Sequence, residues 1–128
     1  GKEDKVGQRV KFAVSPDGER WAADIRSEST RRHRYEIYET GATNPLASFP
    51  GHSAVAITFS PDGRLLALVQ ENNVILHDAA TGQRLAVFAG HSDRVTDVAF
   101  DPGSRTLASV SSDRSVICWD VENHAPRW

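Results

Sequence analysis

The sequence repeats itself with a period of about 40 residues, and this period constrains the fold more than any other feature. The dipeptide Gly-His occurs at residues 51–52 and again at residues 90–91. Each time a serine follows, and a short alternating stretch then ends at Phe59 or Phe100. A more divergent copy precedes these two, from residue 10 to residue 49. Because one copy of this size cannot bury its own apolar faces, we expect the chain to fold by stacking its copies.

Each copy is predicted to contain short β-strands separated by tight turns. The segment SPDG occurs at residues 15–18 and 60–63, where proline presets φ and glycine accepts a positive φ. β-Branched residues dominate the apolar runs, and no run shows a sustained helical period. The predicted strands are residues 10–14, 20–26, 34–39 and 45–49 in the first copy, 54–59, 64–70, 73–78 and 84–89 in the second, and 94–100, 105–111 and 115–121 in the third. The fold class is therefore all-β, with three four-stranded antiparallel sheets, the last of which is expected to lack its outer strand.

Composition excludes several classes of protein. Hydrophobic residues make up 39% of the 128 residues and charged residues 25%, as in soluble globular domains. The 15 Lys and Arg residues against 17 Asp and Glu residues give a net charge of −2, which argues against a general nucleic-acid binder. A single cysteine cannot form an internal disulfide, and the sequence shows neither a signal-peptide pattern nor an apolar run of membrane-spanning length. We therefore expect a cytoplasmic protein without membrane contacts, and the absence of methionine leads us to expect a processed or trimmed piece.

Residues 90–120, GHSDRVTDVAFDPGSRTLASVSSDRSVICWD, resemble a repeat of the WD-repeat β-propeller family, from the Gly-His opening to the Trp-Asp close. The second copy keeps Gly-His and Asp78 but has His77 in place of the tryptophan. The first copy keeps the SPDG turn and has Tyr38 and Glu39 in place of Trp-Asp. The resemblance implies a charged N-terminal arm (1–9) and three propeller blades, namely blade 1 (10–51), blade 2 (52–90) and an incomplete blade 3 (91–128).

Four residues of the third copy match the hydrogen-bonded structural set of this family. The resemblance implies that His91, Ser109, Asp113 and Trp119 are buried together. The indole N–H of Trp119 can donate to the Ser109 hydroxyl, and His91 can link that hydroxyl to the Asp113 carboxylate. The same residue types could form a nucleophilic triad, but no oxyanion-binding loop accompanies them. We therefore expect a structural set and no catalytic residue.

The other histidines and the cysteine show no metal-ligand spacing. No HxH or HxxxH pair joins any of the five histidines, and Cys118 has no CxxC partner. The sequence also lacks the GxGxxG, P-loop and GxSxG motifs of nucleotide-binding proteins and hydrolases. We therefore expect no metal, no cofactor and no enzymatic activity.

The segment RSESTRRHR, residues 26–34, is unusual because the other copies have only a tight turn at this point. The resemblance places this basic loop on the same face as the Gly-His loops, where such propellers commonly bind partners. One interpretation is a solvated hairpin tip, and the other is a contact for an acidic partner segment or a phosphate group, which arginine binds bidentately. Nucleic acid is a weaker candidate because no aromatic residues are interleaved with the arginines. The candidate partner-binding residues are Arg31, Arg32, His33 and Arg34 in this segment and Asp93, Arg94 and Arg114 in the matching loops of the third copy.

Three blades are too few to close a propeller, which has four to eight blades of about 40–45 residues each. They leave two apolar sheet faces and an unfinished sheet edge without cover. We therefore expect a non-catalytic protein–protein interaction scaffold whose propeller is completed by self-association, by another chain or by sequence outside these residues. The alternatives are a nucleic-acid-associated or signalling-regulatory propeller module and, less favoured, an enzyme with its active site at the propeller channel.

Overall fold

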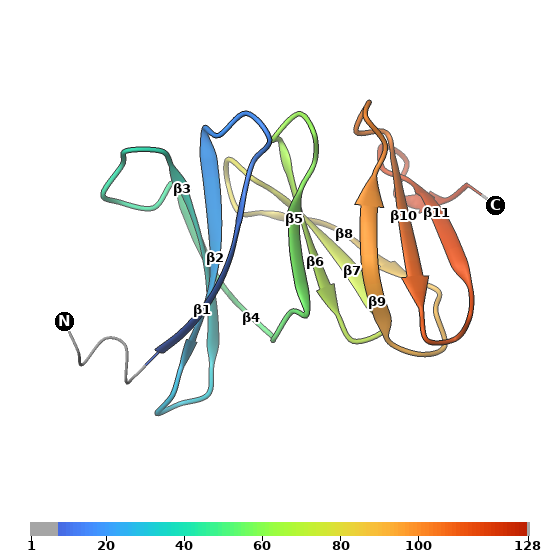
Figure 1. The fold of residues 1–128 in the computed structure, drawn as a ribbon, viewed down its shortest axis with the longest axis horizontal. Coiled ribbons are helices and arrows are strands. Elements are labelled where there is room, and N and C mark those ends of the chain that lie inside the picture. The colour runs from blue at the N-terminus through green and yellow to red at the C-terminus, as the bar shows by residue number, and fades with distance from the viewer. Residues whose placement is uncertain (1–7, 128) are drawn as a thin grey trace.

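The computed structural model describes residues 8–127, which form three four-stranded antiparallel β-sheets. The sheets lie side by side in chain order (Figure 1), and each sheet is one blade. Blade 1 consists of β1 (Gln8–Val14), β2 (Arg20–Ser27), β3 (His33–Glu39) and β4 (Ala47–Gly51). Blade 2 consists of β5 (Ala56–Phe59), β6 (Leu65–Gln70), β7 (Asn73–Asp78) and β8 (Arg84–Ala89). Blade 3 consists of β9 (Val95–Phe100), β10 (Thr106–Ser111), β11 (Val116–Asp120) and β12 (Ala125–Pro126). Consecutive strands pair within every blade, which confirms the all-β fold class.

Blade 3 has a short outer strand, so the expectation that this strand is absent was wrong. In β12, Ala125 lies opposite Asp120 and Pro126 lies opposite Trp119 of β11. The backbone N–H of Arg127 extends this ladder by donating to the Cys118 carbonyl at 2.7 Å. Proline fits here because β12 lies at the edge of the sheet, where its missing N–H interrupts no ladder on the open side.

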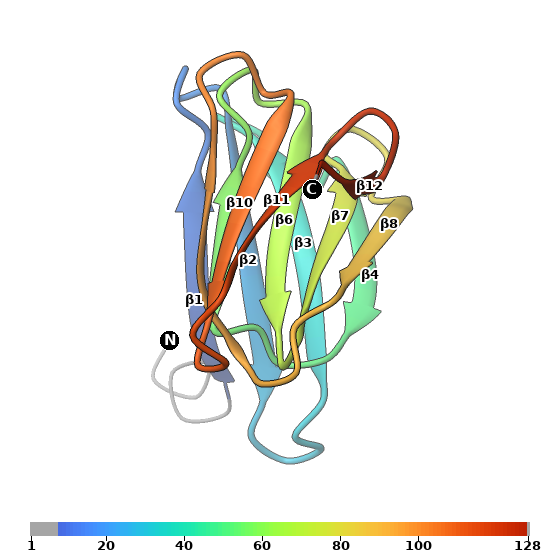
Figure 2. The same cartoon turned by 90° about the vertical axis from the view of Figure 1, so that its right-hand side faces the viewer.

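Apolar side chains join the blades face to face. Successive residues of β6 point to opposite faces, so that Leu66 and Leu68 contact blade 1 while Ala67 and Val69 contact blade 3. Figure 2, which views the stack end-on, shows the blades behind one another, with β1 at one side and the outer strands β4, β8 and β12 towards the other. Blade 2 is therefore buried on both faces, which explains why its central strands consist of nearly continuous apolar runs.

The two ends of the blades differ in character. The SPDG turns lie at the upper end in Figure 1, where Ser15 Oγ donates to Asp17 Oδ1 and Ser60 Oγ donates to Asp62 Oδ1, each at 2.6 Å. Gly63 of the second turn has a φ of 73°, which favours glycine. The opposite end carries the β2–β3 loop and the connections from one blade to the next. We refer to this second end as the loop end.

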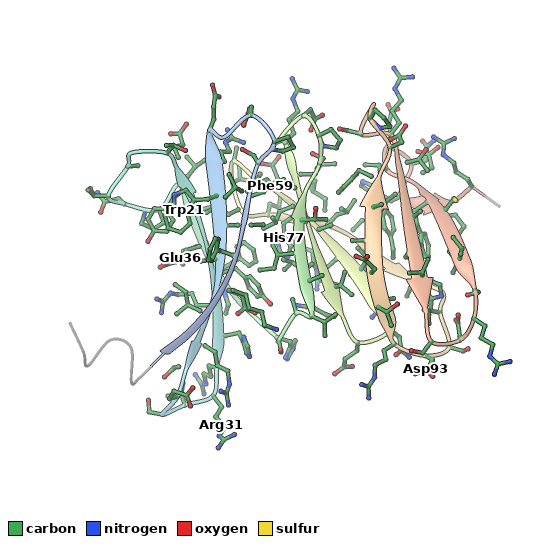
Figure 3. The ribbon with its side chains drawn as sticks, in the orientation of Figure 1. Trp21, Arg31, Glu36, Phe59, His77 and Asp93 are labelled. Carbon is green, nitrogen blue, oxygen red and sulfur yellow. The ribbon has the colours of Figure 1, made fainter. Side chains whose placement is uncertain are left out.

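The outward faces of blades 1 and 3 are not covered by any of the described residues. On β1, Phe12 is 70% exposed and Val14 is 58% exposed, whereas the intervening Ala13 packs towards blade 2. Trp21 lies on the same side of blade 1 (Figure 3) and stacks on Tyr38 with ring centroids 4.3 Å apart. Val110 and Val116 are likewise exposed on the outward face of blade 3. Within residues 8–127 there is no helix of the length and apolarity needed to cross a membrane.

Candidate functional site

The structure brings the four residues of the expected structural set together in blade 3. Trp119 Nε1 donates to Ser109 Oγ at 2.8 Å, and His91 Nε2 lies 2.8 Å from the same hydroxyl oxygen. On the other side of the ring, His91 Nδ1 lies 3.0 Å from Asp113 Oδ2. With a neutral imidazole, the donations run from Trp119 to Ser109, from Ser109 to His91 Nε2, and from His91 Nδ1–H to the carboxylate. This series of hydrogen bonds links β10 and β11 to the loop before β9.

The environment of these residues is unsuited to nucleophilic catalysis. Ser109 is fully buried and its hydroxyl oxygen already accepts the indole N–H, so a substrate cannot reach it. Asp113 lies in the β10–β11 turn, where the hydroxyl of Ser115 and the backbone N–H groups of Ser92 and Ser115 donate to its carboxylate. These hydrogen bonds hold the pKa of Asp113 well below its usual range. The carboxylate therefore stays charged and anchors the turn.

An aromatic ring on the third strand of a blade stacks on the outer strand of the preceding blade at both junctions. Trp119 stacks on Phe88 of β8, with ring centroids 4.7 Å apart. In blade 2 the ring of His77 takes this place and stacks on Phe49 of β4 at 4.2 Å. Like Trp119, His77 forms its hydrogen bond within its own blade: its Nδ1 donates to the Gly82 carbonyl at 2.9 Å. We call the stacking of a third-strand ring on the outer strand of the preceding blade the aromatic step.

We predict that acidification destabilises the protein through His77. Burial lowers the pKa of His77 below its usual value of 6.5, and the hydrogen bond to the Gly82 carbonyl offsets this only in part. As the pH falls below about 6.5, the unfolded chain binds a proton that folded His77 does not take up, so the free energy of unfolding decreases. Urea unfolding at a series of pH values should show a smaller acid-induced loss for His77→Gln than for the wild type. An identical pH dependence in the two proteins would contradict this prediction.

A second polar cluster, which sequence reasoning missed, joins blades 1 and 2. The hydroxyl of Tyr35 donates to the backbone carbonyl of His52, and Gln70 Nε2 donates to the same carbonyl at 2.9 Å. Tyr35 is fully buried, and this burial raises the pKa of its hydroxyl above the usual range, which keeps it a donor. A Cβ at Gly51 would lie 2.6 Å from Tyr35 Cε2, so the glycine of this Gly-His pair is required by the tyrosine ring. The only hint in the sequence is the polar Gln70 at the end of an apolar strand.

The expected basic loop is shorter than the sequence indicates, and two of its candidate residues are already paired. Residues 33 and 34 belong to β3, and only residues 28–32 form the loop. His33 Nδ1 lies 2.6 Å from Oδ1 of the buried Asp24, and Arg34 Nε lies 3.1 Å from Glu36 Oε2. Arg31 and Arg32 extend into solvent, and Figure 3 shows Arg31 at the tip of the loop end.

The candidate partner-binding residues do not form one continuous surface. Arg31, His33 and Arg94 line a groove of about 710 Å³ at the loop end between blades 1 and 2. Arg32 and Arg34 line a different hollow, next to the outer strand of blade 1. Asp93 and Arg114 are exposed at the loop end but line neither of these hollows. Among residues 8–127, no group of three or more His, Cys, Asp or Glu side chains is arranged to hold a metal ion.

Comparison with known families decides the identity of the repeat. The model for the family described as "WD domain, G-beta repeat" matches residues 43–76 and 82–120, which together exceed half of the chain. The chain belongs to the WD40 repeat family. The resemblance seen in the sequence is thereby confirmed. Each matched WD40 segment runs from the outer strand of one blade through the first three strands of the next, so the sequence repeat itself ties neighbouring blades together.

Known proteins with similar WD40 repeats are much longer than this chain. An uncharacterised WD repeat-containing protein of Synechocystis sp. is 36% identical over 72 residues, which cover 56% of this chain and 21% of that protein. Pre-mRNA-processing factor 19 of Mus musculus is 30% identical over 99 residues, which cover 77% of this chain and 19% of that protein. The crystal structure of the RRP9 WD40 repeats matches with a TM-score of 0.74 at 25% identity, covering 96% of this chain and 41% of that one. The chain thus spans about a fifth of these curated relatives and less than half of the solved WD40 structure.

WD40 repeat proteins similar to this chain are typically non-catalytic, and WD40 domains generally mediate protein–protein interactions. The buried Ser109 hydroxyl is already hydrogen-bonded to Trp119 and His91. This agrees with a structural role for the Ser, His and Asp residues of blade 3.

Proposed function

We propose that this chain forms part of a WD40 propeller that acts as a non-catalytic scaffold for protein–protein contacts. The observation that carries the proposal is the pair of apolar faces left open at the two ends of the stack, marked by Phe12 and Val14 on blade 1 and Val116 on blade 3. A sheet with apolar side chains on both faces needs a neighbour on each side to keep them from water. Further blades, from additional sequence, another chain or a second copy, would provide that cover.

The aromatic step supports completion by blades of the same kind. His77 stacks on Phe49 and Trp119 stacks on Phe88, in each case from the third strand of one blade to the outer strand of the blade before it. Tyr38 occupies the corresponding place on β3, opposite Trp21 in the strand register, and faces outwards. A preceding blade with an aromatic side chain on its outer strand would extend the same step to Tyr38.

The loop end is the surface we propose for partner binding. It carries the exposed side chains of Arg31, Arg32, Asp93, Arg94 and Arg114. These residues lie on short turns that are held by backbone hydrogen bonds. Loops on a rigid β-scaffold are the usual place for binding residues, because their side chains can vary without disturbing the core.

We predict that the 128-residue chain self-associates through its outward faces. Size-exclusion chromatography with light scattering should show a defined oligomer, such as a dimer or trimer, rather than a folded monomer. Val14→Ser removes a valine that is 58% exposed on the outward face of blade 1 and should shift the population towards smaller species. Val55→Ser removes a valine that is 61% exposed at the loop end and should leave the oligomeric state unchanged. A wild-type chain that is monomeric and fully folded by circular dichroism would refute the proposal.

A further inference from the structure

The groove between blades 1 and 2 has a composition that the sequence analysis did not anticipate. Its sides come from the β2–β3 loop, the β4–β5 connection, the β6–β7 turn, β8 and the loop before β9. A second hollow of about 390 Å³ shares Gln70, Ile75 and Arg84 with it, so the groove continues outwards between β4 and blade 2. Both walls belong to the same chain, and the groove therefore does not depend on completion of the propeller.

The groove carries an excess of positive charge. Arg31, Arg84 and Arg94 are exposed along it, and within residues 8–127 none of the three forms an ion pair with a carboxylate. Glu71, in the β6–β7 turn, is the one acidic residue of the lining that the structure describes. Since the whole chain has a net charge of −2, this positive surface is a local feature. An anionic ligand would meet three arginines whose charges are not yet balanced.

Hydrogen bonds hold the floor and the walls in place before any ligand arrives. Gln70 Nε2 donates to the His52 carbonyl at 2.9 Å, which ties the β4–β5 connection to β6. The backbone N–H of Val95 donates to the Glu71 carbonyl at 2.8 Å and joins the blade 3 loop to the β6–β7 turn. Binding to a surface that is already ordered avoids the loss of conformational entropy that a mobile loop would incur.

Two exposed valines distinguish the class of ligand. Val55 is 61% exposed and Val87 is 44% exposed, and both lie in the groove beside the arginines. A free phosphate or a sugar–phosphate backbone has no apolar group to place on them. The lining of the 710 Å³ groove includes no Phe, Tyr or Trp on which a base could stack, and Phe49 of the adjoining hollow already stacks on Tyr35 and His77. The side chains of an extended peptide, in contrast, point alternately in two directions. Such a peptide can place acidic side chains on the arginines and aliphatic side chains on the valines.

We infer that the groove between blades 1 and 2 binds an extended acidic peptide segment of a protein partner, with its carboxylates on Arg31, Arg84 and Arg94 and its aliphatic side chains on Val55 and Val87. The inference rests on the proposed scaffold function and names the chemistry of one partner segment. Glu71 repels such a ligand and selects against segments whose acidic residues fall next to the β6–β7 turn.

Fluorescence anisotropy with the 128-residue chain tests this site, using a fluorescein-labelled peptide of alternating glutamate and leucine as the probe. Arg84→Gln, Arg94→Gln and Arg31→Asn should each weaken binding roughly three- to tenfold, because each removes one charge-assisted contact. Asparagine is chosen at position 31 because Arg31 has a φ of 60°, which asparagine tolerates. Glu71→Gln should tighten binding about two- to fivefold by removing the repulsion.

Arg64→Gln provides a matched control for Arg84→Gln. Arg64 is an exposed arginine of blade 2 that follows the SPDG turn and does not line the groove, so its replacement should leave the affinity for the probe unchanged. Equal weakening by Arg84→Gln and Arg64→Gln, or no response to Arg84→Gln, would mean that only general charge attraction acts and would overturn the inference. A glutamine–leucine peptide that binds as well as the probe, or an oligonucleotide that binds better, would overturn it too. If the chain assembles in light scattering but does not bind the probe, only this inference fails and the scaffold function stands.

Discussion

Replacing Trp119 by alanine is expected to lower the free energy of unfolding by about 3–5 kcal/mol. The indole is buried between blades 2 and 3, stacks on Phe88 at 4.7 Å and donates from Nε1 to Ser109 Oγ at 2.8 Å. The substitution leaves a cavity at the blade junction and removes one partner of the Ser109 hydroxyl. Because whole domains are stable by only about 5–15 kcal/mol, thermal and urea unfolding should show a large shift.

Trp21→Ala is the matched control for Trp119→Ala. Trp21 is the same type of residue, but it lies on the outward face of blade 1, half-buried and stacked only on Tyr38. Its removal opens no cavity between two blades and should therefore cost less stability. Trp119→Phe should give an intermediate loss, since it retains a ring against Phe88 but lacks the N–H donor. A melting temperature unaffected by Trp119→Ala would show that the hydrogen-bonded set does not hold blade 3 together.

The strands could be expected from the sequence because they depend on turn chemistry at fixed spacing, and the blade 3 hydrogen-bonded set follows from the resemblance to the WD-repeat family. The SPDG turns combine the restricted φ of proline with a glycine at positive φ, as at Gly63, and they delimit the strands that flank them. Each predicted strand boundary lies within two residues of the observed one. His91, Ser109 and Trp119 occur in a copy whose every segment matches the repeat pattern, and the structure places them within hydrogen-bonding distance.

The groove could not be expected, because it depends on how the blades stack. Arg31 lies more than 50 residues before Arg84 and Arg94, and the three come from different blades or their connections. Arg84 resembles any polar residue of an edge strand, and nothing in the local sequence indicates that it lines the same groove as Arg31. The pairing of His33 with Asp24 was hidden for a similar reason, since partners on adjacent strands depend on a register set by the hairpin as a whole.

Removing Tyr35 is expected to have the second large effect, a loss of about 3–5 kcal/mol for Tyr35→Ala. The ring is fully buried at the junction of blades 1 and 2, where it packs over Gly51 and stacks on Phe49 with ring centroids 5.3 Å apart. Its hydroxyl and Gln70 Nε2 both donate to the His52 carbonyl, so the same side chain fills the core and fixes the connection to blade 2. Tyr35→Phe keeps the ring and should lose only the hydroxyl contribution, about 0.5–1.5 kcal/mol.

Tyr38→Ala separates the role of this junction from that of a tyrosine on β3 in general. Tyr38 lies three residues away on the same strand but faces outwards against Trp21, so its removal should destabilise the chain less than Tyr35→Ala. Hydrogen exchange should show which strands lose stability. We expect faster amide exchange in β3 and β6 of Tyr35→Ala and little change in β10. If Tyr38→Ala proved the more damaging, or if Tyr35→Phe were as severe as Tyr35→Ala, the stacked ring would not be what holds blades 1 and 2 together. The expected order instead follows from burial within the chain, where Tyr35 is packed between blades 1 and 2 and Tyr38 is not.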